Sequence, residues 1–144
     1  MSNSWKPETI AAQAGGHDDE ATGAVVPPIH VATTYIRDPD NAYRRGYGYG
    51  RPDNPVVRQV EEVLTNLEQA GSTLVFASGM AAATATFLSL ERPTHVVAPR
   101  VMYWGLRKWL SEDAPSHGIT TTFVDATNLD EIRAAIVPGK TRLV

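Results

Sequence analysis

The stretch Thr73-Leu74-Val75-Phe76-Ala77-Ser78-Gly79-Met80-Ala81 decides the fold of this chain. Its first five residues form a short, largely apolar run, which is typical of a buried strand. Ser78 is a good N-cap residue, and the alanine-rich run that follows to about Leu90 predicts a helix. A strand that enters a helix through a turn of small residues predicts an α/β fold.

Strand and helix patterns continue to alternate toward the C-terminus. Strands are predicted over residues 94–98 and 120–124, and helices over 103–112 and 129–136. This spacing predicts right-handed crossovers and a mostly parallel sheet with helices on both faces. Because residues 141–144 resemble the start of a further buried strand, we expect the sheet to belong to a larger domain.

Toward the N-terminus, a helix is predicted over residues 54–67. Asn54 suits the N-cap, Pro55 suits the first helical position, and Gly71 stands where a C-terminal cap is expected. The sequence gives Arg58, on this helix, no role in binding a ligand.

Residues 1–53 differ from the rest in composition, being rich in glycine, proline, tyrosine and arginine without a sustained period. Within them, residues 30–35 are strand-like and residues 38–41 indicate a turn. A segment without its own period seldom forms a core, so we interpret residues 1–53 as an arm that packs against another surface. Residues 54–144 are then the first part of a large domain.

The composition excludes several classes of function. The chain has 144 residues, 42% of them hydrophobic, with a net charge of −3 and no cysteine. It is therefore neither a disordered chain nor a disulfide scaffold, and it has no thiolate for a metal or for nucleophilic catalysis. The four histidines lack metal-ligand spacing. We expect a cytoplasmic protein with no nucleic-acid partner, no membrane association and no metal.

The turn at Ser78, Gly79 and Met80 is the first candidate site. A strand that leads into a helix start brings free backbone N–H groups and the positive end of the helix dipole together, which suits a phosphate. In the alternative interpretation Ser78 is only an N-cap and Gly79 only fits the turn. The sequence has neither a P-loop nor the three-glycine dinucleotide motif.

Residues 43–51 (Tyr-Arg-Arg-Gly-Tyr-Gly-Tyr-Gly-Arg) are the second candidate site. Tyrosine and arginine side chains bind phosphates and stack on rings. A solvated loop and a site for single-stranded nucleic acid are the alternatives, the latter weakened by the acidic net charge. Tyr103, after the strand at 94–98, either stacks on a planar ligand or simply packs.

Several motifs, taken together in their order along the chain, resemble those of the Cys/Met-metabolism (transsulfuration) family of pyridoxal-phosphate enzymes. They are Thr22-Gly23-Ala24-Val25-Val26-Pro27-Pro28-Ile29, Tyr47-Gly48-Tyr49-Gly50-Arg51 before Asn54-Pro55, Leu67-Glu68, Ser78-Gly79-Met80-Ala81, and Tyr103 after Val96-Val97-Ala98-Pro99. The resemblance implies fold type I, the aminotransferase-like fold, with pyridoxal 5'-phosphate as cofactor. It covers nearly the whole chain.

The resemblance also implies roles for single residues. The amides of Gly79 and Met80, beside Ser78, hold the cofactor phosphate, and Tyr49 and Arg51 reach it from a neighbouring subunit. Tyr103 stacks on the pyridine ring and has a possible part in leaving-group chemistry. The family is typically a homotetramer, a dimer of dimers with shared active sites.

The chain departs from the family pattern at three points. Trp104 stands where a small residue is usual and is expected to narrow the substrate pocket, and Val56 replaces the commoner threonine. The Schiff-base lysine and the groups that bind the pyridine nitrogen and the substrate carboxylate are expected beyond position 144, in the remaining C-terminal part of the polypeptide. Lys6, Lys108 and Lys140 do not stand in the family's Schiff-base context.

The expected reaction is β- or γ-elimination or γ-replacement on a sulfur amino acid or an O-acyl-homoserine, with cystathionine γ-synthase chemistry favoured. Cystathionine γ-lyase, cystathionine β-lyase and methionine γ-lyase chemistry are the alternatives within the family. Outside it, the alternative is a non-catalytic fragment that binds a phosphate ligand or a partner.

Overall fold

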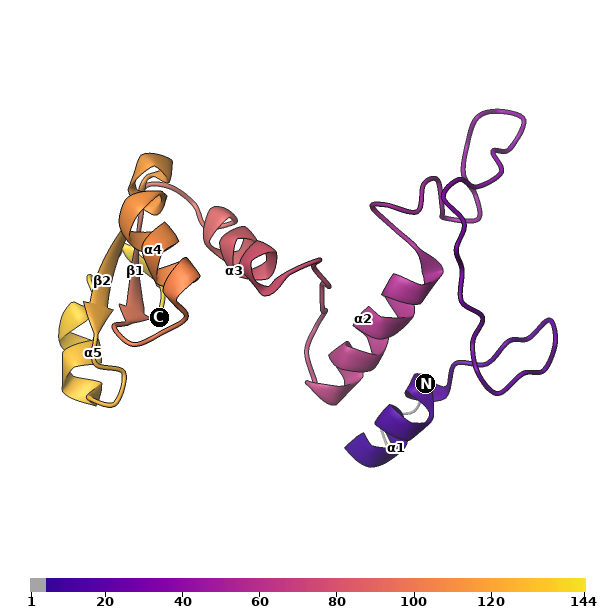
Figure 1. Ribbon diagram of the computed structural model, residues 1–144, viewed down its shortest axis with the longest axis horizontal. Helices are drawn as coiled ribbons and strands as arrows, with labels where there is room; N and C mark the ends of the chain where they lie inside the picture. The colour runs from indigo at the N-terminus through magenta and orange to yellow at the C-terminus, as the bar shows by residue number, and fades with distance from the viewer. Residues whose placement is uncertain (1–4) are drawn as a thin grey trace. The chain divides into compact units, whose positions relative to one another are not determined.

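The computed structural model describes residues 5–144 and divides the chain into two units. The first unit extends to Val75 and the second covers Phe76–Val144 (Figure 1). Each unit has its own secondary structure, and each contains part of the predicted site.

A three-stranded parallel sheet forms the centre of the second unit. Strand β1 (Thr94–Pro99) lies between β2 (Ile119–Val124) and β3 (Thr141–Leu143), and both neighbours run parallel to it. The register with β2 extends from Thr94 opposite Ile119 to Pro99 opposite Val124. The first five residues of β1 are buried, as a central parallel strand requires. The strands predicted at residues 94–98 and 120–124 and their parallel arrangement are confirmed.

Helices α3 (Gly79–Leu88), α4 (Trp104–Glu112) and α5 (Leu129–Ala135) and the 3-10 turn η2 (Ala114–His117) complete the second unit. Leu110 of α4 packs against Val96, Ala98 and Ile119, which share one face of the sheet. Figure 1 shows α4 alongside β1 and β2. Phe87 joins α3 to this core through a tilted contact with Trp109, at 5.9 Å between ring centroids.

The first unit is built around α2 (Pro55–Leu67). The Asn54 side chain accepts a hydrogen bond from the Val56 amide at 2.9 Å, so the predicted N-cap is confirmed. Helix α1 (Pro7–Ala12) and the short turn η1 (Ala14–Gly16) contact α2. Helix α1 was not predicted from the sequence, because residues 1–53 show no sustained period; the helix has six residues and packs against the longer α2.

The strand predicted at residues 73–77 is absent from the sheets among residues 5–144. A strand needs a partner along its backbone, and here the amide of Val75 donates instead to the Glu61 carboxylate at 2.9 Å. The stretch 30–35 likewise forms a single antiparallel bridge, between Thr34 and Tyr49, in place of a strand.

Helix α2 also ends differently from the prediction. Its C-cap is Glu68, and the left-handed residue that follows is Gln69, with φ +51°, in place of Gly71. The Ala70 amide donates to the Thr65 carbonyl at 3.0 Å and so caps the C-terminus of the helix. The left-handed position in such a cap is usually occupied by glycine.

No helix among the described residues is long and apolar enough to cross a bilayer.

Candidate functional site

The N-terminus of α3 presents free donors beside open space. Ser78 has extended backbone angles (φ −155°, ψ 155°), and its Oγ accepts a hydrogen bond from the Ala81 amide at 3.1 Å. Within residues 5–144, the amides of Gly79 and Met80 donate to no protein acceptor. A Cβ atom built on Gly79 would meet nothing within 4 Å. An anion therefore has both room and hydrogen-bond donors here.

The two interpretations of Ser78 are compatible. Its hydroxyl oxygen accepts from Ala81, so the residue is an N-cap. A hydroxyl that accepts one hydrogen bond still carries a proton to donate, so Ser78 is also equipped to contact an anion.

Tyr103 is the residue that precedes the first turn of α4. It follows β1 at the carboxyl end of the sheet, and 69% of its surface is exposed. Its ring lies back over the helix: a Cβ atom on Gly105 would approach the Tyr103 Cε1 atom to 2.9 Å. An exposed ring held at this edge is free to stack on a planar ligand.

Trp104, one of the residues that depart from the family pattern, has 72% of its surface exposed. The Lys108 ammonium lies 5.5 Å from the centroid of one of its rings. This contact holds a cation over the indole on the outer face of α4. The expected effect of Trp104 on a substrate pocket stays a prediction.

Tyr49 and Arg51 lie together in the first unit. Nη2 of Arg51 donates to the Tyr49 hydroxyl at 3.3 Å, and the guanidinium carbon lies 5.2 Å from the Tyr49 ring centroid. Among the residues that the structure describes, Arg51 forms no ion pair with a carboxylate. Its charge is therefore available to an anion.

The segment that carries this pair is fixed to the chain beside it. The Gly50 amide donates to the Thr33 carbonyl at 2.8 Å, and Tyr49 bridges Thr34. A Cβ atom on Gly50 would lie 2.6 Å from the Ala32 carbonyl oxygen, which is closer than real Cβ atoms approach. The contacts favour a positioned segment over a solvated loop.

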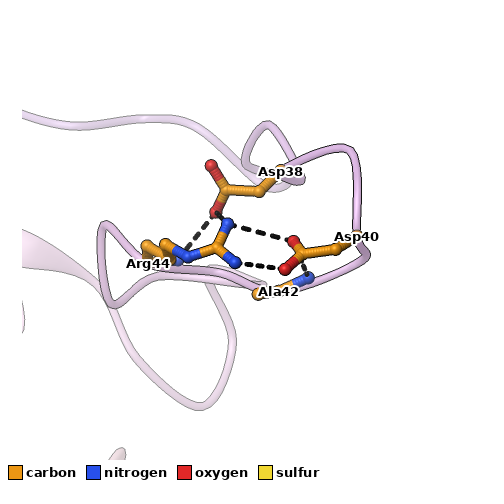
Figure 2. A network of polar contacts seen from close by, with 4 residues as sticks. All are labelled: Asp38, Asp40, Ala42 and Arg44. Carbon is orange, nitrogen blue, oxygen red and sulfur yellow. Dashed lines mark hydrogen bonds and ion pairs between the residues drawn. The ribbon is translucent and has the colours of Figure 1, made fainter.

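Two neighbouring arginines are already paired with carboxylates. Arg44 forms ion pairs with Asp38 and Asp40 in the turn predicted from the sequence (Figure 2). The hydrogen bond from Arg44, with a further one from the Ala42 amide, lowers the pKa of Asp40 below its usual value. Arg58 pairs in the same way with Asp53. This pairing removes positive charge from the stretch and disfavours the nucleic-acid interpretation.

Three features of the site were not predicted from the sequence: the close approach at Gly50, the glycine under the Tyr103 ring, and the Asp53–Arg58 pair. The sequence offered a signal for the first two features, because Gly50 and Gly105 lie next to or near the predicted site residues Tyr49 and Tyr103. The pair has a spacing of five residues across a helix start, which no simple helical pattern indicates. Within the described part of the chain, no group of three or more histidines or acidic residues is placed to hold a metal ion.

Together, the parallel sheet and the turn at Ser78 define an α/β protein whose helix start offers free backbone donors and room for an anion. The chain belongs to the family described as Cys/Met metabolism PLP-dependent enzyme, whose model matches residues 8–144. This finding confirms the resemblance inferred from the motifs.

Named relatives differ in their reactions. A probable cystathionine γ-synthase of Herpetosiphon aurantiacus is 36% identical over 136 residues, which are 94% of this chain and 42% of the relative. A cystathionine γ-lyase of Bacillus subtilis is 35% identical over 134 residues, which are 93% of this chain and 35% of the relative. The chain thus spans well under half the length of these relatives.

Solved structures confirm the fold class. The crystal structure of metB from Corynebacterium glutamicum matches with a TM-score of 0.88 at 30% identity, covering 98% of this chain and 37% of that one. The chain therefore has the fold-type I architecture of the PLP-dependent enzymes.

The residues present fit the phosphate of pyridoxal phosphate, the cofactor of the family. The fit rests on the backbone amides of Gly79 and Met80, which donate to no protein acceptor among the described residues, and on the open space at Gly79. A larger residue at position 79 would place its side chain in that space, so glycine leaves the room that a phosphate needs.

Proposed function

We propose that the protein containing this chain is a PLP-dependent transsulfuration enzyme that acts on an amino-acid substrate. The observation that carries the proposal is the start of α3, where the amides of Gly79 and Met80 donate to no protein acceptor among the described residues and a Cβ atom on Gly79 would meet nothing within 4 Å. Family membership supports the same cofactor. The bound cofactor withdraws electrons from the substrate carbon at which bonds break.

This chain supplies binding and orientation. The Gly79 and Met80 amides and the Ser78 hydroxyl hold the cofactor phosphate, whose negative charge the α3 dipole also favours. Tyr49 and Arg51 donate to the same phosphate from a neighbouring subunit. The planar guanidinium of Arg51 offers two parallel N–H donors, where a lysine would offer only a point charge.

Tyr103 supplies a flat surface for the cofactor ring. Its exposure and its place at the carboxyl end of β1 support this role, because ligands of open α/β sheets bind at that edge. Its hydroxyl, near the reacting part of the substrate, is then positioned to exchange a proton with a leaving group.

For the reaction itself, we favour γ-replacement on an O-acyl-homoserine, the chemistry of a cystathionine γ-synthase. The similarity to a probable γ-synthase and to metB supports it. Elimination from cystathionine is the second candidate, because a γ-lyase and a β-lyase are about equally similar in sequence. A homotetramer with residues 1–53 as an intersubunit arm, and a location in the cytoplasm, remain predictions.

The test uses the protein as its gene encodes it, purified without added cofactor. We expect visible absorbance from bound pyridoxal phosphate and one phosphate per chain after denaturation. Incubation with O-acyl-homoserine and cysteine should yield cystathionine faster than cystathionine yields an oxo acid. The reverse order would assign a lyase, and a colourless protein that takes up no cofactor would contradict the proposal.

A further inference from the structure

One arginine on α2 contacts both sides of the segment that carries Tyr49 and Arg51. The Arg58 Nε donates to Asp53 Oδ1 at 2.7 Å, and its Nη2 donates to Asp53 Oδ2. The same Nη2 also donates to the carbonyl oxygen of Gly46 at 3.2 Å. Gly46 precedes the segment and Asp53 follows it, so a single side chain ties its two ends together.

The guanidinium of Arg58 also covers an aromatic side chain inside the segment. Its carbon lies 4.4 Å from the centroid of the Tyr47 ring, and that ring lies 5.4 Å from the ring of Tyr35. Such stacking over an aromatic face is a contact that arginine makes and lysine reproduces poorly. Residues 46–53 are thus held at their ends and along one side.

The charges of Arg58 and Arg51 are used differently. Arg58 is neutralised by Asp53, whose pKa is lowered below its usual value mainly by the hydrogen bond from Arg58. Arg51, in contrast, has no carboxylate partner among the described residues. The paired arginine therefore stabilises the segment and leaves the other free for an anion.

We propose that Arg58 is a positioning residue that holds residues 46–53 in the shape in which Tyr49 and Arg51 bind the cofactor phosphate. The inference rests on the proposed function, which assigns that phosphate to the pair. Arg58 does not touch the cofactor. It acts by ordering the segment before binding, so that less conformational entropy is lost when the phosphate arrives.

The test compares Arg58→Gln, Arg58→Lys and Asp53→Asn in the full protein with a matched control, Arg44→Gln. Arg44 is also an exposed arginine paired with an aspartate of the first unit, but its partners Asp38 and Asp40 precede the segment. Two quantities are measured in the cofactor-free protein. One is the dissociation constant of pyridoxal phosphate, by titration, and the other is the hydrogen exchange of the backbone N–H groups within residues 46–53, where Pro52 has none.

Arg58→Gln is expected to weaken cofactor binding roughly tenfold and to speed exchange within residues 46–53 but not within α2. Asp53→Asn should have a similar effect, and the double variant should be no worse than either single one, because both remove the same contact. Arg58→Lys should recover part of the affinity. Arg44→Gln should leave both quantities unchanged.

The outcomes separate this inference from the proposed function. Wild-type protein that binds no pyridoxal phosphate overturns the proposed function, and the inference with it. If the wild type binds the cofactor and Arg58→Gln binds it equally well, only the positioning role is overturned. Faster exchange throughout α1 and α2 in Arg58→Gln would also overturn it, because the residue would then support the whole unit.

Discussion

The backbone of Gly50 and the backbone of Ala32 approach each other so closely that no side chain fits between them. A Cβ atom on Gly50 would lie 2.6 Å from the Ala32 carbonyl oxygen. Beside this contact, the Gly50 amide donates a hydrogen bond to the Thr33 carbonyl oxygen at 2.8 Å. This contact fixes the position of Tyr49 and Arg51 on either side of Gly50.

Gly50→Ala is therefore expected to push the segment away from residues 32–34 and to weaken retention of pyridoxal phosphate by about tenfold or more, since backbone atoms cannot yield as a flexible side chain does. The measurement is cofactor loss during dialysis. Gly71→Ala is the matched control, because a Cβ atom there meets nothing within 4 Å. Equal retention by the two variants would contradict the role of the contact.

The elements that were predicted correctly from the sequence are those fixed by neighbouring residues. Asn54, Ser78 and Asn128 each accept a hydrogen bond from an amide two or three residues on, so the starts of α2, α3 and α5 follow from local sequence. Helix α1 was missed although Pro7 and Glu8 are ordinary first-turn residues, because six residues give too little period to detect.

Features that depend on distant partners could not be predicted in this way. Residues 73–77 have a strand's composition, yet Val75 donates to Glu61, fourteen positions earlier in the sequence. The site shows the same division. The free amides at Gly79 follow from a helix start, whereas the close approach of Gly50 to Ala32 depends on how two stretches without a repeat pattern pack together.

Gly79→Pro tests the phosphate-binding amides. Proline at the first position of α3 removes one N–H donor and keeps the helix start, because Ser78 already has the extended angles that a residue before proline prefers. Loss of one hydrogen bond to a charged phosphate should weaken cofactor binding by roughly 10- to 100-fold, or about 1.5–3 kcal/mol. The dissociation constant of the cofactor is the measurement.

The matched control for that variant is Leu129→Pro. Leu129 is the first residue of α5, its predecessor Asn128 is also extended, and its side chain is largely exposed. A comparable loss of affinity in this variant would show that proline at a helix start acts through stability and not through the missing donor.

Gly105→Ala is expected to displace the Tyr103 ring. The added Cβ atom would lie 2.9 Å from the ring edge, and the exposed ring can swing away at small cost to the fold. We expect a shift in the visible absorbance of the bound cofactor with a change in stability below about 1 kcal/mol. Ser111→Ala, on the same helix, should leave the spectrum unchanged, and an unshifted spectrum in Gly105→Ala would argue against stacking by Tyr103.

His95 joins all three strands of the sheet from within β1. Its ring nitrogens lie 2.8 Å from the hydroxyl oxygens of Thr122 on β2 and Thr141 on β3, and only 8% of the residue is exposed. His95→Leu should leave both hydroxyls without this partner and lower the free energy of unfolding by about 2–4 kcal/mol. Chemical denaturation measures the change. Thr120→Val, at a neighbouring position of β2, should cost less than half as much, and an equal cost would contradict the bridging role.

The Asp53–Arg58 pair also gives a prediction about pH. Arg58 lowers the pKa of Asp53 in the folded protein, so the stabilisation from this carboxylate is complete above the pKa of a free aspartate, about 4. It is lost as the pH falls through the lower pKa of the folded state. An NMR titration of the Asp53 carboxyl carbon should therefore show a pKa below the ordinary value in the wild type and a return toward it in Arg58→Gln. Between pH 5 and 8 the protection of residues 46–53 from hydrogen exchange should not change. An ordinary Asp53 pKa in the wild type would mean that the pair with Arg58 does not persist in solution.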